Sequence, residues 1–124
     1  MPDTDFKPVV YLLQGCPFCM KLRVFLLEAG VIDQVEIRLL AQDSDALRHA
    51  RETLAMHLPK VGFPTVETSP GQYLAESDAI IDWFATRAST DVSTLLTFQD
   101  FVGGMFAGHV ALLRENMTLK QQLA

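Results

Sequence analysis

Two cysteines, in the stretch Cys16-Pro17-Phe18-Cys19, are the residues whose type and spacing most clearly suggest chemistry. A pair of thiols separated by two residues can alternate between dithiol and disulfide and so exchange electrons with other thiols. An almost uninterrupted apolar run precedes the pair, and Pro17 suits the first position of a helix. The pattern therefore predicts that Cys16 lies at the N-cap of a helix that follows a buried strand.

This position favours the thiolate form of Cys16. Free backbone N–H groups and the positive end of the helix dipole stabilise an anion, and the amides of Phe18 and Cys19 are free to point at its sulfur. In such a pair, the pKa of a cysteine falls from ~8.5 into a range of roughly 3.5–7.5. Lys21 and Arg23 follow closely and are expected to act in the same direction. Cys19, one turn deeper, is expected to keep its proton and to serve as the resolving thiol.

Two other roles for the cysteine pair are less favoured. The chain has only two cysteines and no Cys or His pair at matching spacing, so we expect no zinc site. A structural disulfide across so short a loop would constrain little of the unfolded chain. The pair is therefore interpreted as a redox-active disulfide.

Composition sets the broad class of the protein. The chain has 124 residues, which predicts one domain with a hydrophobic core. Its net charge of −5 predicts that it does not bind nucleic acid. The N-terminus is acidic and polar, unlike a secretory signal, and no apolar run approaches the ~20 residues that span a bilayer. Two cysteines without a signal peptide fit a reducing cytosol. We expect a cytoplasmic protein without membrane contact.

The hydrophobic pattern predicts elements in the order β-α-β, then α, then β-β-α. The predicted strands are 7–13, 35–39, 64–68 and 73–75, and the predicted helices are 17–29, 44–58 and 76–88. The buried positions expected on the helices are Leu22, Phe25, Leu26 and Ala29, then Leu47, Ala50, Leu54 and Leu58, then Ile80, Ile81, Phe84 and Ala88. This order predicts an α/β protein with a thioredoxin-like fold: a four-stranded mixed sheet with helices on both sides and strand 35–39 at an edge.

A helical extension is predicted after this domain. Asp91 can cap a segment from Val92 to about Asn116, whose apolar residues approximate helical spacing. Gly103, Gly104 and Gly108 interrupt it, which indicates a kink or two shorter helices. We expect residues 1–88 to form the thioredoxin-like domain and residues 89–124 to pack on it, with a frayed end from Thr118.

Three motifs, in order, resemble the glutaredoxin family. Cys16-Pro17-Phe18-Cys19 looks like its dithiol active site, and Gly62-Phe63-Pro64-Thr65-Val66 looks like its cis-proline loop. Ala75-Glu76-Ser77-Asp78-Ala79-Ile80 is similar to the start of its glutathione-binding helix, and is even closer to the N-terminal domains of glutathione transferases. The resemblance covers about residues 7–88.

The resemblance implies a glutathione site. A cis bond at Phe63-Pro64 would turn the backbone of Phe63 toward Cys16, where it can pair with the cysteine of glutathione. Ser77, at a helix N-terminus, would bind the γ-glutamyl carboxylate. The binding residues implied are Pro17, Phe18, Lys21, Lys60, Phe63, Pro64, Glu76, Ser77 and Asp78, with Glu76 or Asp78 for the ammonium and Lys21 or Lys60 for the glycyl carboxylate.

The chain departs from glutaredoxins at some positions. Leu13 stands where many have a lysine, Gly62-Phe63 replaces their usual Thr-Val, and the Gly-Gly before their last helix is absent. These differences affect substrate preference more than chemistry. His49, His57 and His109 have no second residue at a spacing typical of a catalytic or metal-binding motif, and all three are interpreted as structural.

The leading hypothesis is a glutaredoxin-type, glutathione-dependent thiol–disulfide oxidoreductase of electron transport and cell redox homeostasis, with Cys16 and Cys19 catalytic and glutathione as co-substrate. The expected partners are disulfide-containing or glutathionylated proteins, and the expected state is a monomer or weak homodimer. One alternative is a glutathione-transferase-like glutathione-binding or regulatory module that acts through a protein partner. Another is an iron–sulfur cluster held by Cys16 and glutathione between two protomers.

Overall fold

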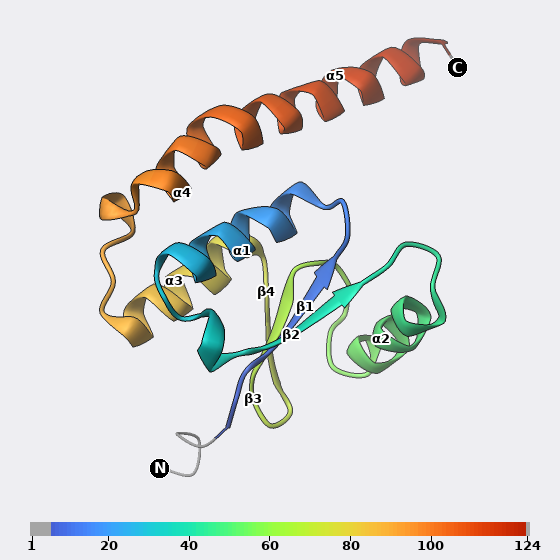
Figure 1. Cartoon of the computed structure of the whole chain (residues 1–124). Coiled ribbons are helices and arrows are strands. Elements are labelled where there is room, and N and C mark those ends of the chain that lie inside the picture. The colour runs from blue at the N-terminus through green and yellow to red at the C-terminus, as the bar shows by residue number, and fades with distance from the viewer. Residues whose placement is uncertain (1–5, 124) are drawn as a thin grey trace.

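Four strands form one mixed sheet in the order β2-β1-β3-β4 (Figure 1). The computed structural model describes residues 6–123. The strands are β1 (Val9–Leu13), β2 (Glu36–Leu40), β3 (Thr65–Ser69) and β4 (Gln72–Ala75). β1 pairs in parallel with β2 and antiparallel with β3, and β3 pairs antiparallel with β4. The predicted thioredoxin-like arrangement is confirmed, and β2 lies at the predicted edge.

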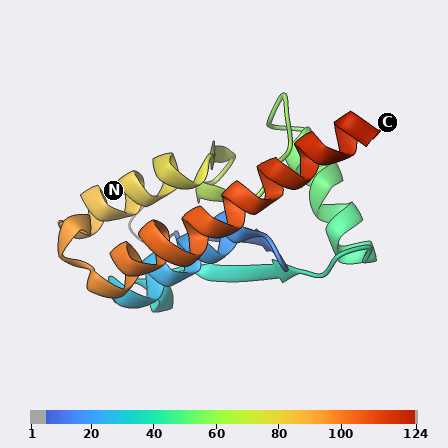
Figure 2. The ribbon, with the colours of Figure 1, turned by 90° about the horizontal axis from the view of Figure 1, so that it is seen from above.

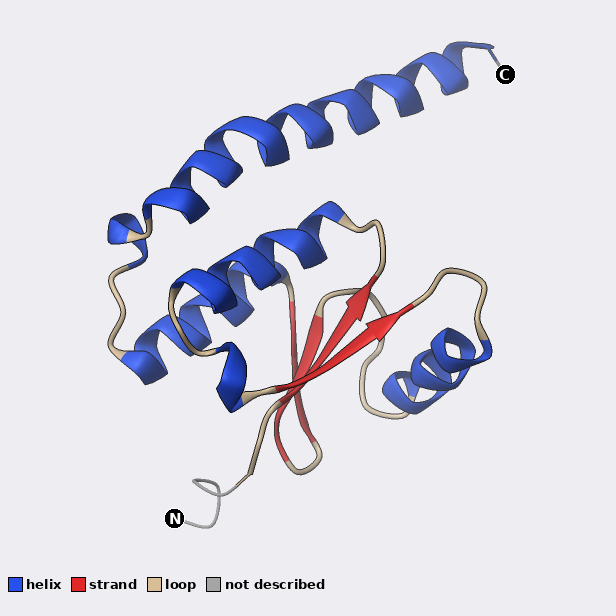
Figure 3. Ribbon diagram, in the orientation of Figure 1, coloured by secondary structure: helices blue, strands red, loops and turns tan. Residues whose placement is uncertain are grey.

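Helices cover both faces of the sheet (Figure 3). α1 (Pro17–Glu28) and α3 (Ser77–Ala88) cover one face, and α2 (Asp45–Ala55) covers the other. Side chains alternate along β1, so Val10 and Leu12 enter the core under α1 and α3, whereas Val9 and Tyr11 enter the core under α2. Because β1 is buried on both faces, it reads as a continuous apolar run rather than an alternating one.

The helices begin and end largely where the sequence predicts. Ser44 caps α2, and its Oγ accepts a hydrogen bond from the amide of Leu47 at 3.1 Å. α2 ends at Ala55, three residues before the predicted end at Leu58, which instead lies in the turn before Pro59 and packs on the smaller core. Ala88 is exposed and Ala85 is buried in its place, because Ala88 is the last residue of α3.

The C-terminal segment crosses above α1 (Figure 2). It contains the short helix η3 (Val92–Thr94), α4 (Leu96–Phe101), a π-helical turn η4 (Val102–Phe106) and α5 (Ala107–Leu123). The predicted interruption at Gly103 and Gly104 is therefore a π-helical turn. The carboxylate of Glu28, at the end of α1, accepts hydrogen bonds from the amides of Thr97 and Phe98 at 3.0 and 2.7 Å, which anchors the start of α4 to the domain.

The second half of this segment does not pack on the domain. Phe98 is buried, but every described residue after Val110 is exposed. α5 continues to Leu123, and the fraying expected from Thr118 stays a prediction. Taken together, Leu96–Leu123 is a helix of 28 residues that is long and apolar enough to cross a membrane by length and composition. Length and composition alone do not identify a membrane span, and the expectation of no membrane contact stays a prediction.

Candidate active site

Cys16 lies at the N-cap of α1, as the sequence predicts. Its backbone is extended, with φ of −88° and ψ of 121°, and Pro17 occupies the first helical position. Gly15, immediately before it, has φ of +77°, a conformation that glycine adopts at little cost, and it turns the chain from β1 into the helix. Cys16 is partly exposed and Cys19 is buried, and both are reduced. The strand and the helix therefore present one accessible thiol with a second thiol behind it.

Hydrogen bonds lower the pKa of the Cys16 thiol to about 6. The largest cause is the hydrogen bond from the Cys19 thiol, which outweighs the opposing effect of burial; the amides of Cys19 and Phe18 act in the same direction as the thiol. Neither Lys21 nor Arg23 is among the causes, so the expected help from these two cations is not found. Cys16 is therefore largely a thiolate at neutral pH.

Cys19 is the proton donor of the pair. Its hydrogen bond to Cys16 and its burial raise the pKa of the Cys19 thiol far above the usual range for cysteine. The amide of Leu13 donates a hydrogen bond to its sulfur at 3.3 Å, which holds the side chain in place. The two cysteines thus have opposite protonation states, which suits a nucleophile and a resolving thiol.

The peptide bond between Phe63 and Pro64 is cis, as the resemblance implies. The carbonyl oxygen of Phe63 lies 3.9 Å from the Cys16 sulfur, where it can accept a weak hydrogen bond only from the protonated thiol. Thr65, buried at the start of β3, donates a hydrogen bond from Oγ1 to the carbonyl of Gly62 at 2.7 Å and closes this loop. A loop distant in sequence therefore places backbone polar groups beside the nucleophile.

The N-terminus of α3 faces the same region. Glu76 is its N-cap and has φ of +76°, which is uncommon for a residue with a side chain and costs conformational energy. No side chain within residues 6–123 caps the helix, and the first N–H groups of a helix have no intrahelical partner. Ser77 is buried at the first helical position. These free N–H groups are suited to bind a carboxylate.

A groove of about 330 Å³ connects these elements. Eight of the nine residues that the resemblance implies for glutathione line it, and Pro17 lies outside it. The eight are Phe18, Lys21, Lys60, Phe63, Pro64, Glu76, Ser77 and Asp78, joined by Gly62 and Ala75. Residues from α1, from the loop before β3 and from the start of α3 therefore meet in one groove beside Cys16.

Two of these residues already pair with each other. The Lys21 ammonium donates a hydrogen bond to Asp78 Oδ1 at 2.8 Å, and the Lys21 side chain is 6% exposed whereas that of Asp78 is 90% exposed. The sequence offered Lys21 for the glycyl carboxylate and Asp78 for the ammonium of glutathione. In this structure, each is instead the partner of the other.

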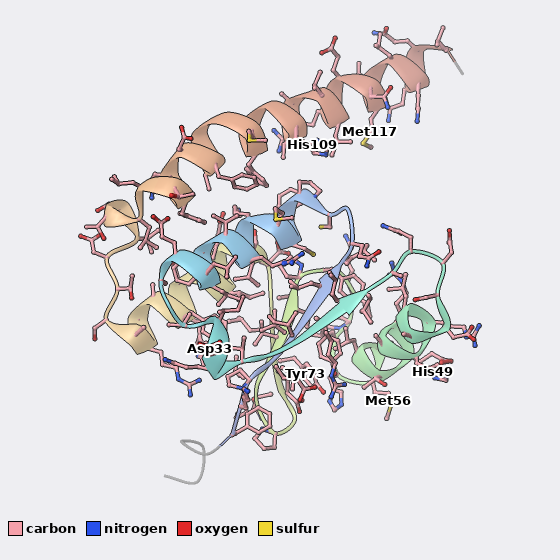
Figure 4. All side chains as sticks on the ribbon, in the orientation of Figure 1. Asp33, His49, Met56, Tyr73, His109 and Met117 are labelled. Atoms are coloured by element: carbon pink, nitrogen blue, oxygen red, sulfur yellow. The ribbon has the colours of Figure 1, made fainter. Side chains whose placement is uncertain are left out.

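A second cavity, of about 250 Å³, lies on the other side of Cys16. Its walls are mostly apolar and come from the loop after β1, from α1 and from the C-terminal segment. The lining residues are Leu13, Gln14, Gly15, Cys16, Pro17, Cys19, Met20, Arg23, Phe101, Met105, Phe106 and His109. In Figure 4, His109 lies on the side of α5 that faces α1. Sequence reasoning missed this cavity, because no local signal shows how the extension folds back.

The described residues contain no group of three or more His, Cys, Asp or Glu side chains that would hold a metal ion. This does not bear on an iron–sulfur cluster shared between two protomers, which would need an accessible cysteine from each. Cys16 is the only cysteine with access to solvent. The expected absence of a zinc site stays a prediction.

Solved structures show where else this fold occurs. The chain is 26% identical to a possible glutathione S-transferase from Rhodopseudomonas palustris, with a TM-score of 0.51 over 65% of this chain and 40% of that one. Glutathione transferase Omega 2C from Trametes versicolor is 21% identical, with a TM-score of 0.52 over 67% of this chain and 38% of that one. A glutathione transferase homologue from Sulfitobacter, solved with bound glutathione, is 16% identical, with a TM-score of 0.51 over 89% and 55%.

The match to these proteins is partial. The chain spans about two fifths of the first two structures and about half of the third. No curated protein matches the sequence significantly. The family model for the glutathione S-transferase N-terminal domain matches the sequence over residues 10–91. These residues include both cysteines, the cis-proline loop and all of α3. Since this match covers more than half of the chain, the protein belongs to the family of glutathione S-transferase N-terminal domains.

Proposed function

We propose that the protein is a glutathione-dependent thiol–disulfide oxidoreductase of the glutaredoxin type. The observation that carries this proposal is the pair of thiols with opposite protonation, Cys16 ionised and Cys19 protonated, with Cys16 in contact with Phe63 of the groove that the implied glutathione-binding residues line. A thiolate is the nucleophile of thiol–disulfide exchange. Membership of the family supports glutathione as the thiol that it uses.

In the proposed reaction, the Cys16 thiolate attacks the glutathione sulfur of a mixed disulfide. A bond forms between Cys16 and glutathione, and the other thiol leaves as a thiolate. A second glutathione, as thiolate, then attacks the glutathione sulfur of this intermediate, which yields oxidised glutathione and restores the Cys16 thiolate. In the dithiol route, Cys19 loses its proton and attacks Cys16 instead, which forms the internal disulfide and releases glutathione.

The groove suggests how glutathione is oriented. The free N–H groups of α3 and Ser77 would bind the γ-glutamyl carboxylate. The backbone of Phe63 would pair with the cysteine of glutathione and bring its sulfur toward Cys16, which Phe63 already contacts. Lys21 or Lys60, which both line the groove, would receive the glycyl carboxylate; Lys21 also pairs with Asp78.

The test is the reduction of a glutathione mixed disulfide of a small thiol, coupled to glutathione reductase, by the wild type, Cys16→Ser and Cys19→Ser. We expect Cys16→Ser to be inactive and Cys19→Ser to retain activity through the monothiol route. Equal activity in all three proteins would refute the proposal. For the groove, Ser77→Ala is expected to weaken glutathione binding, with the exposed Ser93→Ala as the matched control; unchanged affinity in Ser77→Ala would place the carboxylate elsewhere.

A glutathione transferase is the second candidate, and the apolar cavity beside Cys16 favours it. In that reaction, the thiolate of glutathione forms a carbon–sulfur bond with an apolar electrophile, and a leaving group departs from the carbon. An assay with 1-chloro-2,4-dinitrobenzene, which releases chloride, distinguishes the two candidates. Turnover of this compound that survives Cys16→Ser, together with no reduction of mixed disulfides by the wild type, would favour the transferase.

A further inference from the structure

Phe106 is the residue that the C-terminal segment places against the groove-lining side chains of α1. It is the last residue of the π-helical turn η4. Its ring meets the ring of Phe18 edge to face, with centroids 5.2 Å apart and planes at 83°. Its ring centroid also lies 4.7 Å from the Lys21 nitrogen, and that of Phe18 lies 5.7 Å from the same atom. Two aromatic rings and one carboxylate thus surround the ammonium of Lys21.

These contacts explain how a buried ammonium is tolerated. Lys21 is 5% exposed, and a charged group removed from water needs partners. Asp78 accepts one hydrogen bond from it, and the negative faces of the two rings supply further electrostatic stabilisation. An ammonium has three donors, and within residues 6–123 the nitrogen of Lys21 makes one hydrogen bond, so donors remain for an anion in the groove that Lys21 lines.

Phe106 does not line the groove itself. It lines the neighbouring apolar cavity, whereas Phe18, Lys21 and Asp78 line the groove. Any influence of Phe106 on a molecule in the groove therefore passes through Lys21 and Phe18. A lysine side chain has a flexible four-carbon stem, and Asp78 is too exposed to hold it alone in water. The ring of Phe106 closes the side of Lys21 that would otherwise open into the cavity.

We propose that Phe106 is a positioning residue of the glutathione site: it holds the Lys21 ammonium at the groove wall, where the ammonium receives a carboxylate of glutathione. The inference rests on the proposed function. On this proposal the C-terminal segment contributes to the glutathione site, because the π-helical turn that contains Gly103 and Gly104 brings Phe106 over α1. Aromatic character at position 106, and not only apolar bulk, is what the arrangement requires.

The experiment measures binding of S-methylglutathione, whose blocked sulfur does not react with Cys16, by calorimetry. Phe106→Leu keeps apolar bulk and removes the ring, and we expect its Kd to be about 2- to 30-fold higher than that of the wild type. Phe106→Tyr keeps the ring and is expected to bind within about twofold of the wild type. Met105→Leu is the control, because Met105 lines the same cavity but is exposed and is not among the groups near Lys21; we expect little change.

A double-mutant cycle separates positioning from a general structural effect. Lys21→Met should weaken binding, and Phe106→Leu should add no further loss in the Lys21→Met background. In the disulfide reduction assay, Phe106→Leu should raise KM for glutathione and leave kcat and the pKa of Cys16 unchanged. The same binding experiment with S-methylglutathione whose glycyl carboxylate is converted to the amide identifies the carboxylate: a Phe106→Leu effect that disappears assigns the glycyl group, and one that persists assigns the γ-glutamyl group.

Two results would overturn the inference. One is wild-type binding of S-methylglutathione with an unchanged Kd in Phe106→Leu. The other is a Phe106→Leu substitution that weakens binding of S-methylglutathione by the same factor in the wild type and in the Lys21→Met background. If Phe106→Leu does not fold, as judged by circular dichroism, Phe106→Tyr and Phe106→Trp still decide the question, because both must bind like the wild type. Failure of the wild type to bind S-methylglutathione would instead refute the proposed function.

Discussion

Replacing Cys19 tests the origin of the ionised Cys16. The Cys19 thiol donates the hydrogen bond that contributes most to lowering the pKa of Cys16 from 9.0 to about 6. Cys19→Ala removes this donor and leaves the amides of Phe18 and Cys19, opposed by burial. We therefore expect the pKa of Cys16 to rise by more than one unit, to about 7–8.5.

The change is large at neutral pH. With a pKa of about 6, about nine-tenths of Cys16 is thiolate at pH 7. With a pKa of about 8, the fraction falls to about a tenth. The midpoint of thiolate formation therefore moves from the acidic to the alkaline side of neutrality. Cys19→Ser keeps a hydroxyl donor and is expected to give an intermediate pKa.

The assay follows thiolate absorbance near 240 nm and the rate of alkylation by iodoacetamide from pH 4 to pH 10. Cys16→Ser identifies the signal that belongs to Cys16 and serves as the control. A pKa in Cys19→Ala that stays near 6 would refute the reasoning, because the helix amides alone would then account for the thiolate.

Three further predictions concern the scaffold of the site. Phe25→Ala removes a fully buried ring that packs against Phe98 and should lower the free energy of unfolding by about 3–5 kcal/mol in denaturant titrations; a loss below about 1 kcal/mol would contradict this packing. Ser44→Ala should cost about 1 kcal/mol in the same experiment, since it removes the N-cap of α2, whereas a neutral effect would show that the cap contributes nothing. Glu28→Ala should speed amide exchange in residues 96–101, because two backbone amides of α4 lose their acceptor. Glu36→Ala, in an exposed ion pair, is its control and should leave α4 unchanged.

The sequence was informative wherever local rules decide the structure. Pro17 after Cys16 predicts the helix start, and the free amides that follow predict a lowered pKa. Gly71 after Pro70 predicts a turn between β3 and β4, and its φ of +77° agrees. The cis bond at Pro64 came from the family resemblance, because few X-Pro bonds are cis and no local rule selects this one.

The parts that the sequence did not reveal depend on contacts between distant segments. Lys21 and Asp78 are 57 residues apart, and nothing in the local sequence indicates that they pair with each other. Phe106 and the apolar cavity depend on a π-helical turn that folds the C-terminal segment over α1. The hydrophobic spacing of that segment predicts a helix, but not how much of it the domain covers.

The most direct test of the central claim is to trap the mixed disulfide. Cys19→Ser is incubated with oxidised glutathione, and the adduct is located by intact-mass and peptide mass spectrometry. We predict one glutathione per chain, attached to the only remaining cysteine, Cys16, released by reduced glutathione, and formed with a pH midpoint between those of the wild type and Cys19→Ala. A Cys16 that stays unmodified above pH 7, while a small thiol reagent still reaches it, would contradict the account.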